Sequence, residues 1–209
     1  VATTGLGTSQ QASAQQAQTA EKVSAQPPSH YETSMETGAI PEGYTAEQAN
    51  HYFIQSPGSD YMVDVVKNLG IDYIASNPGS SFRGFQESIT TYGGNKKPEF
   101  LTCLHEESAA ALAHGYSKIA YKPMGIAVHG TVGLQHAAMG IYNAYCDRAP
   151  MVIFAGNHME MTGRRPGAEW HHSALDCVKL VRDFIKWDDI PLSLEHYGSS
   201  LTRAYKIAV

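Results

Sequence analysis

Short, largely apolar runs alternate with segments of helical periodicity over most of this chain. The runs lie at 71–76, 100–104, 124–128 and 151–155. Strands that are apolar along their whole length are buried on both faces, and helical segments of about 10–15 residues between them favour parallel pairing. The sequence therefore predicts an α/β fold: a parallel sheet with helices on both faces.

Helical patterns fill the intervals between the strands. An apolar stripe from Met62 to Leu69 has helical spacing, with Ser59 expected as its N-cap and Gly70 at the left-handed position beyond its end. An apolar helical face is expected over 177–184 and a weak strand over 185–187. Further helices are predicted at 82–92, 107–121, 132–145 and 194–209.

Residues 1–50 differ in composition from the predicted domain at 51–209. They are poor in large apolar side chains, which indicates a low-complexity tail or an arm. Ala12-Ser13-Ala14 fits the small-x-small pattern of an export cleavage site. A linker fits equally well, so a periplasmic and a cytoplasmic location both stay open. Export would fit the predicted fold only through a pathway that carries folded proteins.

Charge and cysteine usage exclude several classes of function. The net charge is −5 and the longest basic cluster is Lys96-Lys97, so no nucleic-acid partner is expected. No stretch reaches the roughly 20 apolar residues of a membrane span. The three cysteines form no C-x-x-C pair. Glu169 with His171-His172 is a weak metal pattern, because adjacent histidines point to opposite sides; no metal ligand is expected in this chain.

Polar, glycine-containing sequence follows three of the predicted strands. In a parallel sheet the carboxyl ends of the strands share one edge, where ligands bind. These segments are therefore candidates for a single site: Asn77-Pro78-Gly79-Ser80, His105-Glu106, and 129–133 beginning at His129.

Glu106 is the most informative residue at this edge. It follows an apolar strand and precedes an alanine-rich helix, so we expect its carboxyl group to be partly buried. Burial raises the pKa of a carboxyl group, and a helix N-terminus opposes that. A carboxylic acid poised near neutrality can lend a proton and take it back. An ordinary helix-start acid fits the same position, and His129 alone fits an ordinary hydrogen-bonded histidine.

The segment 104–116 around Glu106 resembles the catalytic-glutamate segment of the acetolactate synthase and benzoylformate decarboxylase family of thiamine-diphosphate enzymes. The turn at 77–80 resembles the first-strand turn of that family. The match covers 59–209, and it also includes the segments 140–145, 150–157 and 182–187.

The resemblance implies that this is the domain that binds the aminopyrimidine ring of thiamine diphosphate. Glu106 would stabilise the imino tautomer of the cofactor, which then removes the thiazolium C2 proton to give the ylide. The ylide would attack a 2-oxo acid, which is then decarboxylated or joined to a second substrate. The cofactor pocket would be lined by Asn77, Pro78, Gly79, Val132, Gly133 and His136.

His129 and Ser80 resemble residues of the decarboxylase branch that bind the substrate carboxylate and move protons. Thr131-Val132-Gly133 departs from the Gly-Pro-Gly of the synthases, and His136 stands where Asn is common. Both departures leave decarboxylation and carboligation open.

The family holds the diphosphate through Mg²⁺ on a second domain, with a Gly-Asp-Gly motif that this sequence lacks. We therefore expect a diphosphate-binding domain from the same gene product or another subunit, in a homodimer or homotetramer. The sequence stops inside a helical pattern, which favours a fragment. A natural pyrimidine-only subunit and a non-catalytic or regulatory domain remain alternatives.

Overall fold

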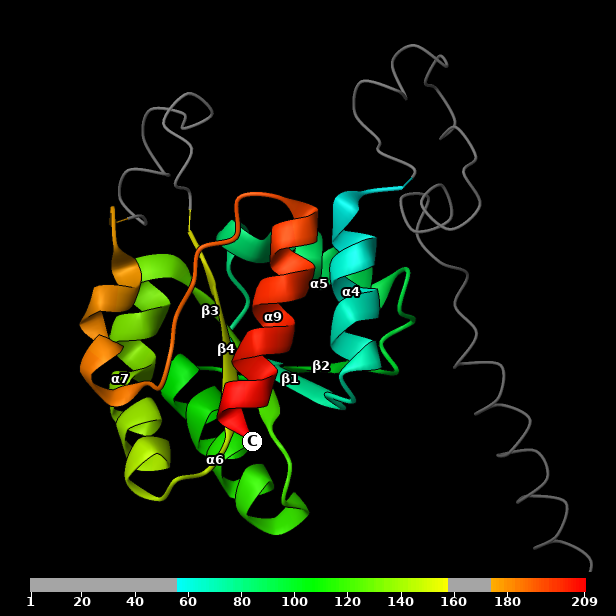
Figure 1. The fold of residues 1–209 in the computed structure, drawn as a ribbon. Coiled ribbons are helices and arrows are strands. Elements are labelled where there is room, and N and C mark those ends of the chain that lie inside the picture. The colour runs from blue at the N-terminus through cyan, green and yellow to red at the C-terminus, as the bar shows by residue number, and fades with distance from the viewer. Residues whose placement is uncertain (1–55, 158–173) are drawn as a thin grey trace, which may run out of the picture. The chain divides into compact units, whose positions relative to one another are not determined.

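The computed structural model describes residues 56–157 and 174–209, which form one compact unit around a four-stranded sheet. All strand pairs are parallel and the strand order is β2-β1-β3-β4 (Figure 1). The predicted α/β architecture is therefore confirmed. The strands are β1 (Tyr73–Ser76), β2 (Glu99–Thr102), β3 (Met124–His129) and β4 (Met151–Gly156).

Helices connect the strands as the periodicity predicted. The helix after β2, α6 (Glu106–Ala120), lies against the helix after β3, α7 (Gly130–Cys146) (Figure 1). Each of the five α-helices in the described residues begins and ends close to its expected bounds: α4 (Gly58–Asn68), α5 (Arg83–Thr90), α6 (Glu106–Ala120), α7 (Gly130–Cys146) and α9 (Leu194–Ala208).

Alternate strand residues face two separate cores. Ile74 packs with side chains of α4, α5 and α9, whereas its neighbour Ala75 packs with those of α6 and α7. In β3, Ala127 joins the first of these cores and Ile126 the second. Helices therefore cover both faces of the sheet, and both faces exclude water, as the continuous apolar runs predicted.

The first described helix has a different N-cap from the one expected. Pro57 occupies the cap position of α4, and the Ser59 hydroxyl instead accepts a hydrogen bond from Ser88 of α5 at 2.7 Å. Ser59 therefore joins two helices and does not terminate one. Gly70 has a φ of +75°, which confirms the predicted left-handed conformation after α4.

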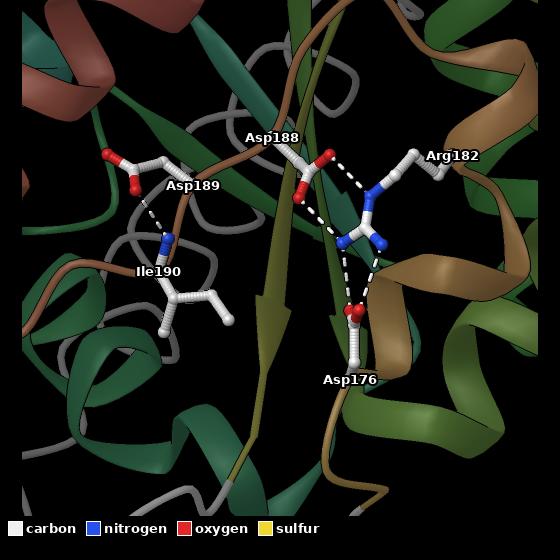
Figure 2. A network of polar contacts seen from close by, with 5 residues as sticks. All are labelled: Asp176, Arg182, Asp188, Asp189 and Ile190. Carbon is white, nitrogen blue, oxygen red and sulfur yellow. Dashed lines mark hydrogen bonds and ion pairs between the residues drawn. The ribbon is translucent and has the colours of Figure 1, made fainter.

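Residues 177–187 contradict two local predictions. The segment 177–184 forms two short 3-10 helices, η2 (Cys177–Leu180) and η3 (Arg182–Phe184), with Val181 between them, and 185–187 form no strand. Arg182 is the reason: its guanidinium donates two hydrogen bonds to Asp176 and two to Asp188, at 2.8–2.9 Å (Figure 2). This clamp holds the segment in turns, while Ile185 is partly buried by packing and not by strand pairing.

Within the described residues, no helix is both long enough and apolar enough to cross a membrane. The expected tail at 1–50, its export pattern and the weak metal pattern at 169–172 lie outside the described residues.

Candidate active site

The carboxyl ends of the strands meet at one edge, as the sequence analysis predicted. Ser76 at the end of β1 pairs with Thr102 of β2 and Ala127 of β3, and His129 of β3 pairs with Gly156 of β4. The buried Ser76 hydroxyl donates to the Ala127 carbonyl at 2.7 Å, which ties β1 to β3 just below this edge. The carboxyl ends of all four described strands therefore share the same rim.

Glu106 is the buried carboxylate of this rim. His105 ends the connection from β2 in an extended conformation and caps α6, because its Nδ1 accepts a hydrogen bond from the Glu107 amide at 3.2 Å. Glu106 is the first residue of the helix and is only 2% exposed. Its carboxylate is hydrogen-bonded by the Asn77 side chain from the β1 turn and by His136 of α7, whose Nδ1 lies 3.1 Å from Oε2.

These partners decide the protonation state of Glu106. Burial raises the pKa of the carboxyl group, but hydrogen bonds from its own backbone amide, His136 and Asn77, together with the charge of His136, outweigh burial. The pKa of Glu106 therefore lies below its ordinary value. From the sequence, burial and the helix N-terminus act on the pKa of Glu106 in opposite directions. In the structure the lowered pKa favours the ionised form of the carboxyl group.

A second polar pair lies beside the first on the same rim. His129 Nδ1 is 2.7 Å from the Ser81 hydroxyl. Any Cβ on Gly79 would lie 2.5 Å from the His129 Cβ, and one on Gly156 would collide with the Ser81 hydroxyl. The two glycines therefore make the room in which Ser81 and His129 meet.

Ser81 was not among the residues predicted from the sequence, whereas its neighbour Ser80 was. Ser80 is exposed and begins the 3-10 turn η1 (Ser80–Phe82). Two adjacent serines give no sequence signal that separates them, since the direction of each side chain depends on the turn. Pro78 is also exposed, whereas Asn77 and Gly79 are half-buried.

The start of α7 lies tightly against β3. A Cβ on Gly133 would lie 2.9 Å from the Val128 Cβ and 3.0 Å from the Val128 carbonyl carbon, so only glycine fits there. Val132 is half-buried in the first turn of this helix. The Thr131 hydroxyl accepts a hydrogen bond from the Ala174 amide at 2.8 Å, which ties the segment leading into η2 to the same rim.

One grouping at the rim was not predicted. His105, Glu106 and His136 offer ligand atoms that all lie within 4.8 Å of one another, although the sequence analysis expected no metal ligand. The two imidazole rings stack with centroids 4.7 Å apart and an interplanar angle of 23°. His136 could have been suspected from its place where the resembled family carries Asn, but the proximity of His105 follows from the capping conformation.

A buried, ionised carboxylate lies on the rim of a parallel α/β sheet and is held by Asn77 after β1 and by His136 of α7, at the edge where domains of this class bind their ligands. Residues 57–176 match the family model described as "Thiamine pyrophosphate enzyme, N-terminal TPP binding domain". The chain belongs to this family of thiamine-diphosphate-dependent enzymes.

Several curated relatives carry related sequences. The acetolactate synthase large subunit of Haemophilus influenzae is 29% identical over 152 residues, which is 72% of this chain and 25% of the relative. The 2-hydroxyacyl-CoA lyase of Saccharomyces cerevisiae is 26% identical over 129 residues, 62% of this chain and 22% of the relative. The chain thus spans about a quarter of the length of these relatives.

Solved structures share the fold. Benzoylformate decarboxylase from Polynucleobacter necessarius superposes with a TM-score of 0.61 at 22% identity, covering 71% of this chain and 26% of that one. A thiamine-diphosphate-dependent 4-hydroxybenzoylformate decarboxylase from Rhodococcus jostii gives a TM-score of 0.60 at 22% identity, with 72% and 27% covered.

Proposed function

We propose that this chain supplies the pyrimidine-binding half of the active site in a thiamine-diphosphate-dependent enzyme acting on a 2-oxo acid, by decarboxylation or carboligation. The observation that carries the proposal is the burial of the Glu106 carboxylate at the rim, with Asn77 and His136 bonded to it. Carboxylates that are buried and held by specific hydrogen-bond partners at a ligand-binding edge are typical of functional sites.

The rim residues fit the aminopyrimidine ring of the cofactor. The Glu106 carboxylate would accept a hydrogen bond from a protonated nitrogen of the pyrimidine ring, and this would keep the proton on that nitrogen. Asn77 and His136 orient its carboxylate, while Pro78, Gly79, Val132 and Gly133 line the pocket. The bound cofactor would supply the nucleophilic carbon that attacks the substrate.

The pair formed by His129 and Ser81 lies where a substrate carboxylate could be received. Ser81 bonds one imidazole nitrogen of His129 and so fixes its tautomer, which allows His129 to bind the 2-oxo acid and move a proton. Ser80 at the exposed start of η1 is a second substrate contact in this proposal.

A second domain must complete the site. The diphosphate and its Mg²⁺ would be held by a diphosphate-binding domain of the same gene product or of another subunit, in a homodimer or homotetramer. A coding sequence that continues past Val209 into such a domain would dismiss the alternative of a natural pyrimidine-only subunit.

The test replaces Glu106 with Gln in the full-length protein, with Glu107→Gln as the matched control. Glu107 is the exposed neighbour on the same helix turn. Exchange of the thiazolium C2 proton of bound thiamine diphosphate, followed by NMR, should slow by about 100-fold or more in the Glu106 variant and stay unchanged in the control. Equal exchange in both variants would instead favour the remaining alternative, a non-catalytic or regulatory domain that keeps the fold.

A further inference from the structure

The side chains of His105, Glu106 and His136 form a hydrogen-bonded group that also has the composition of a metal-ligand set. Two imidazoles and one carboxylate converge from the N-terminus of α6 and the second turn of α7, with all ligand atoms within 4.8 Å of one another. Two histidines with one glutamate are a ligand set that Zn²⁺ uses in proteins, and imidazole also suits Co²⁺ and Ni²⁺.

The distances need little adjustment. Two ligands on a tetrahedral zinc ion lie about 3.3 Å apart, given Zn–N bonds of about 2.0–2.1 Å. Glu106 Oε2 and His136 Nδ1 are already 3.1 Å apart. His105 is exposed, and one of its ring nitrogens lies within 4.8 Å of the other two ligand atoms, so that nitrogen needs to approach by no more than about 1.5 Å. The Nδ1 of His105 caps the helix, so metal binding through Nε2 would leave the cap in place.

Burial and charge favour a cation at this point. The side chain of Glu106 is 3% exposed and that of His136 is 50% exposed, so an ion could enter from solvent along the imidazoles and meet the buried charge. A dication beside a desolvated carboxylate offsets the cost of burying it. The ion would be of the zinc class, because Mg²⁺ disfavours imidazole ligands.

We propose that the cofactor-free protein binds one zinc-class divalent ion through His105, Glu106 and His136, and that this ion blocks Glu106 from the cofactor. The blocking step rests on the proposed function, whereas metal binding itself does not.

The test titrates Co²⁺ into the cofactor-free full-length protein and follows its visible absorption bands. One equivalent should bind, and Zn²⁺ should displace it. His136→Asn and His105→Asn should each weaken binding by about tenfold or more, since loss of even an indirect metal contact costs that much. Asn keeps a helix-capping side chain at 105 and a donor to Glu106 at 136, so both variants should fold.

Two controls separate this site from other histidines. His196 forms a comparable pair with Asp189, at 3.0 Å, and His196→Asn should leave Co²⁺ binding unchanged. The double variant His171→Asn, His172→Asn should also bind normally. Wild-type affinity in both the 105 and 136 variants, or loss of binding in either control, would overturn the metal site.

Competition with the cofactor tests whether the metal ion blocks Glu106. Thiamine, which has no diphosphate to chelate Co²⁺ in solution, should weaken Co²⁺ binding to the protein, with a readout that requires no turnover. Binding that depends on His136 but ignores thiamine would support the metal site and overturn the block. A failed Glu106→Gln experiment would reject the proposed function and leave the metal result standing.

Discussion

His136 Nδ1 lies 3.1 Å from Oε2 of Glu106, which joins the second turn of α7 to the first residue of α6. An ionised carboxylate only accepts hydrogen bonds, so this imidazole nitrogen carries the hydrogen. The contact fixes the direction of the carboxylate before any ligand arrives, and it makes the stability of the domain depend on the charge of Glu106.

The free energy of unfolding should therefore be larger when the Glu106 carboxyl group is ionised than when it is protonated. Its folded-state pKa lies below the ordinary value of 4.5. The resulting stabilisation is present above about pH 4.5 and is lost as the pH falls through the lowered pKa. Glu106→Gln should be less stable than wild type by about 1–3 kcal/mol at pH 7 in urea unfolding, with a smaller difference at pH 3. A difference that is the same at both pH values, or an equal pH dependence in Glu107→Gln, would contradict this assignment.

Gly79 should not tolerate a side chain. A Cβ there would meet the His129 Cβ at 2.5 Å, so Gly79→Ala should lower the free energy of unfolding by about 1–3 kcal/mol. Gly115→Ala is the matched control, because Gly115 is an exposed residue of α6 with nothing within 4 Å of its added Cβ. That variant should be neutral or more stable by up to about 1 kcal/mol. Chemical denaturation measures both, and an undisturbed Gly79 variant would refute the close approach.

Ser81, and not Ser80, should control the tautomer of His129. Ser81→Ala removes the hydroxyl 2.7 Å from Nδ1 and should shift the ¹⁵N resonance of that nitrogen, at a stability cost of about 1 kcal/mol. Ser80→Ala should leave the resonance in place. A larger shift in the Ser80 variant would show that the two serines exchange roles in solution.

The clamp of Arg182 on Asp176 and Asp188 should order the chain locally and not stabilise the whole domain. Arg182→Lys keeps the charge but loses both two-bond contacts, because an ammonium group has no planar fork. Amide hydrogen exchange over 176–188 should accelerate, while the unfolding midpoint barely moves. Lys179→Arg is a control on the same segment. Unchanged exchange at 176–188 would show that packing of Ile185 alone holds the turns.

The fold could be predicted because hydrophobic periodicity and continuous apolar runs are properties of whole segments and do not depend on single side-chain contacts. Continuous apolar runs such as 124–128, with helical patterns on both sides, favour parallel strands that helices cover on both faces, and this predicts the α/β architecture. The pattern at 177–184 misled for the opposite reason. Spacing alone does not separate an α-helix from successive 3-10 turns, and the deciding contacts of Arg182 depend on residues on both sides of the segment.

The position of the candidate site, at the carboxyl ends of the strands, could be predicted from the sequence. Because parallel strands share one edge, the sequence alone was enough to group Asn77, Glu106 and His129. Side-chain directions did not follow in the same way: Ser81 faces His129 because of a 3-10 turn, and His105 meets His136 because it caps a helix. The charge of Glu106 depends on hydrogen bonds that only the assembled rim provides.

The close packing of α6 on α7 has a consequence for engineering this domain. A Cβ on Gly140 would lie 2.7 Å from the Ala110 Cβ, so the two helices approach too closely there to admit one more methyl group. Ala110 lies one helical turn after Glu106, and Gly140 lies one turn after His136. Mutational libraries aimed at new substrates should therefore keep Gly140 fixed, since an alanine there would spread the two helix starts and pull the imidazole away from the carboxylate.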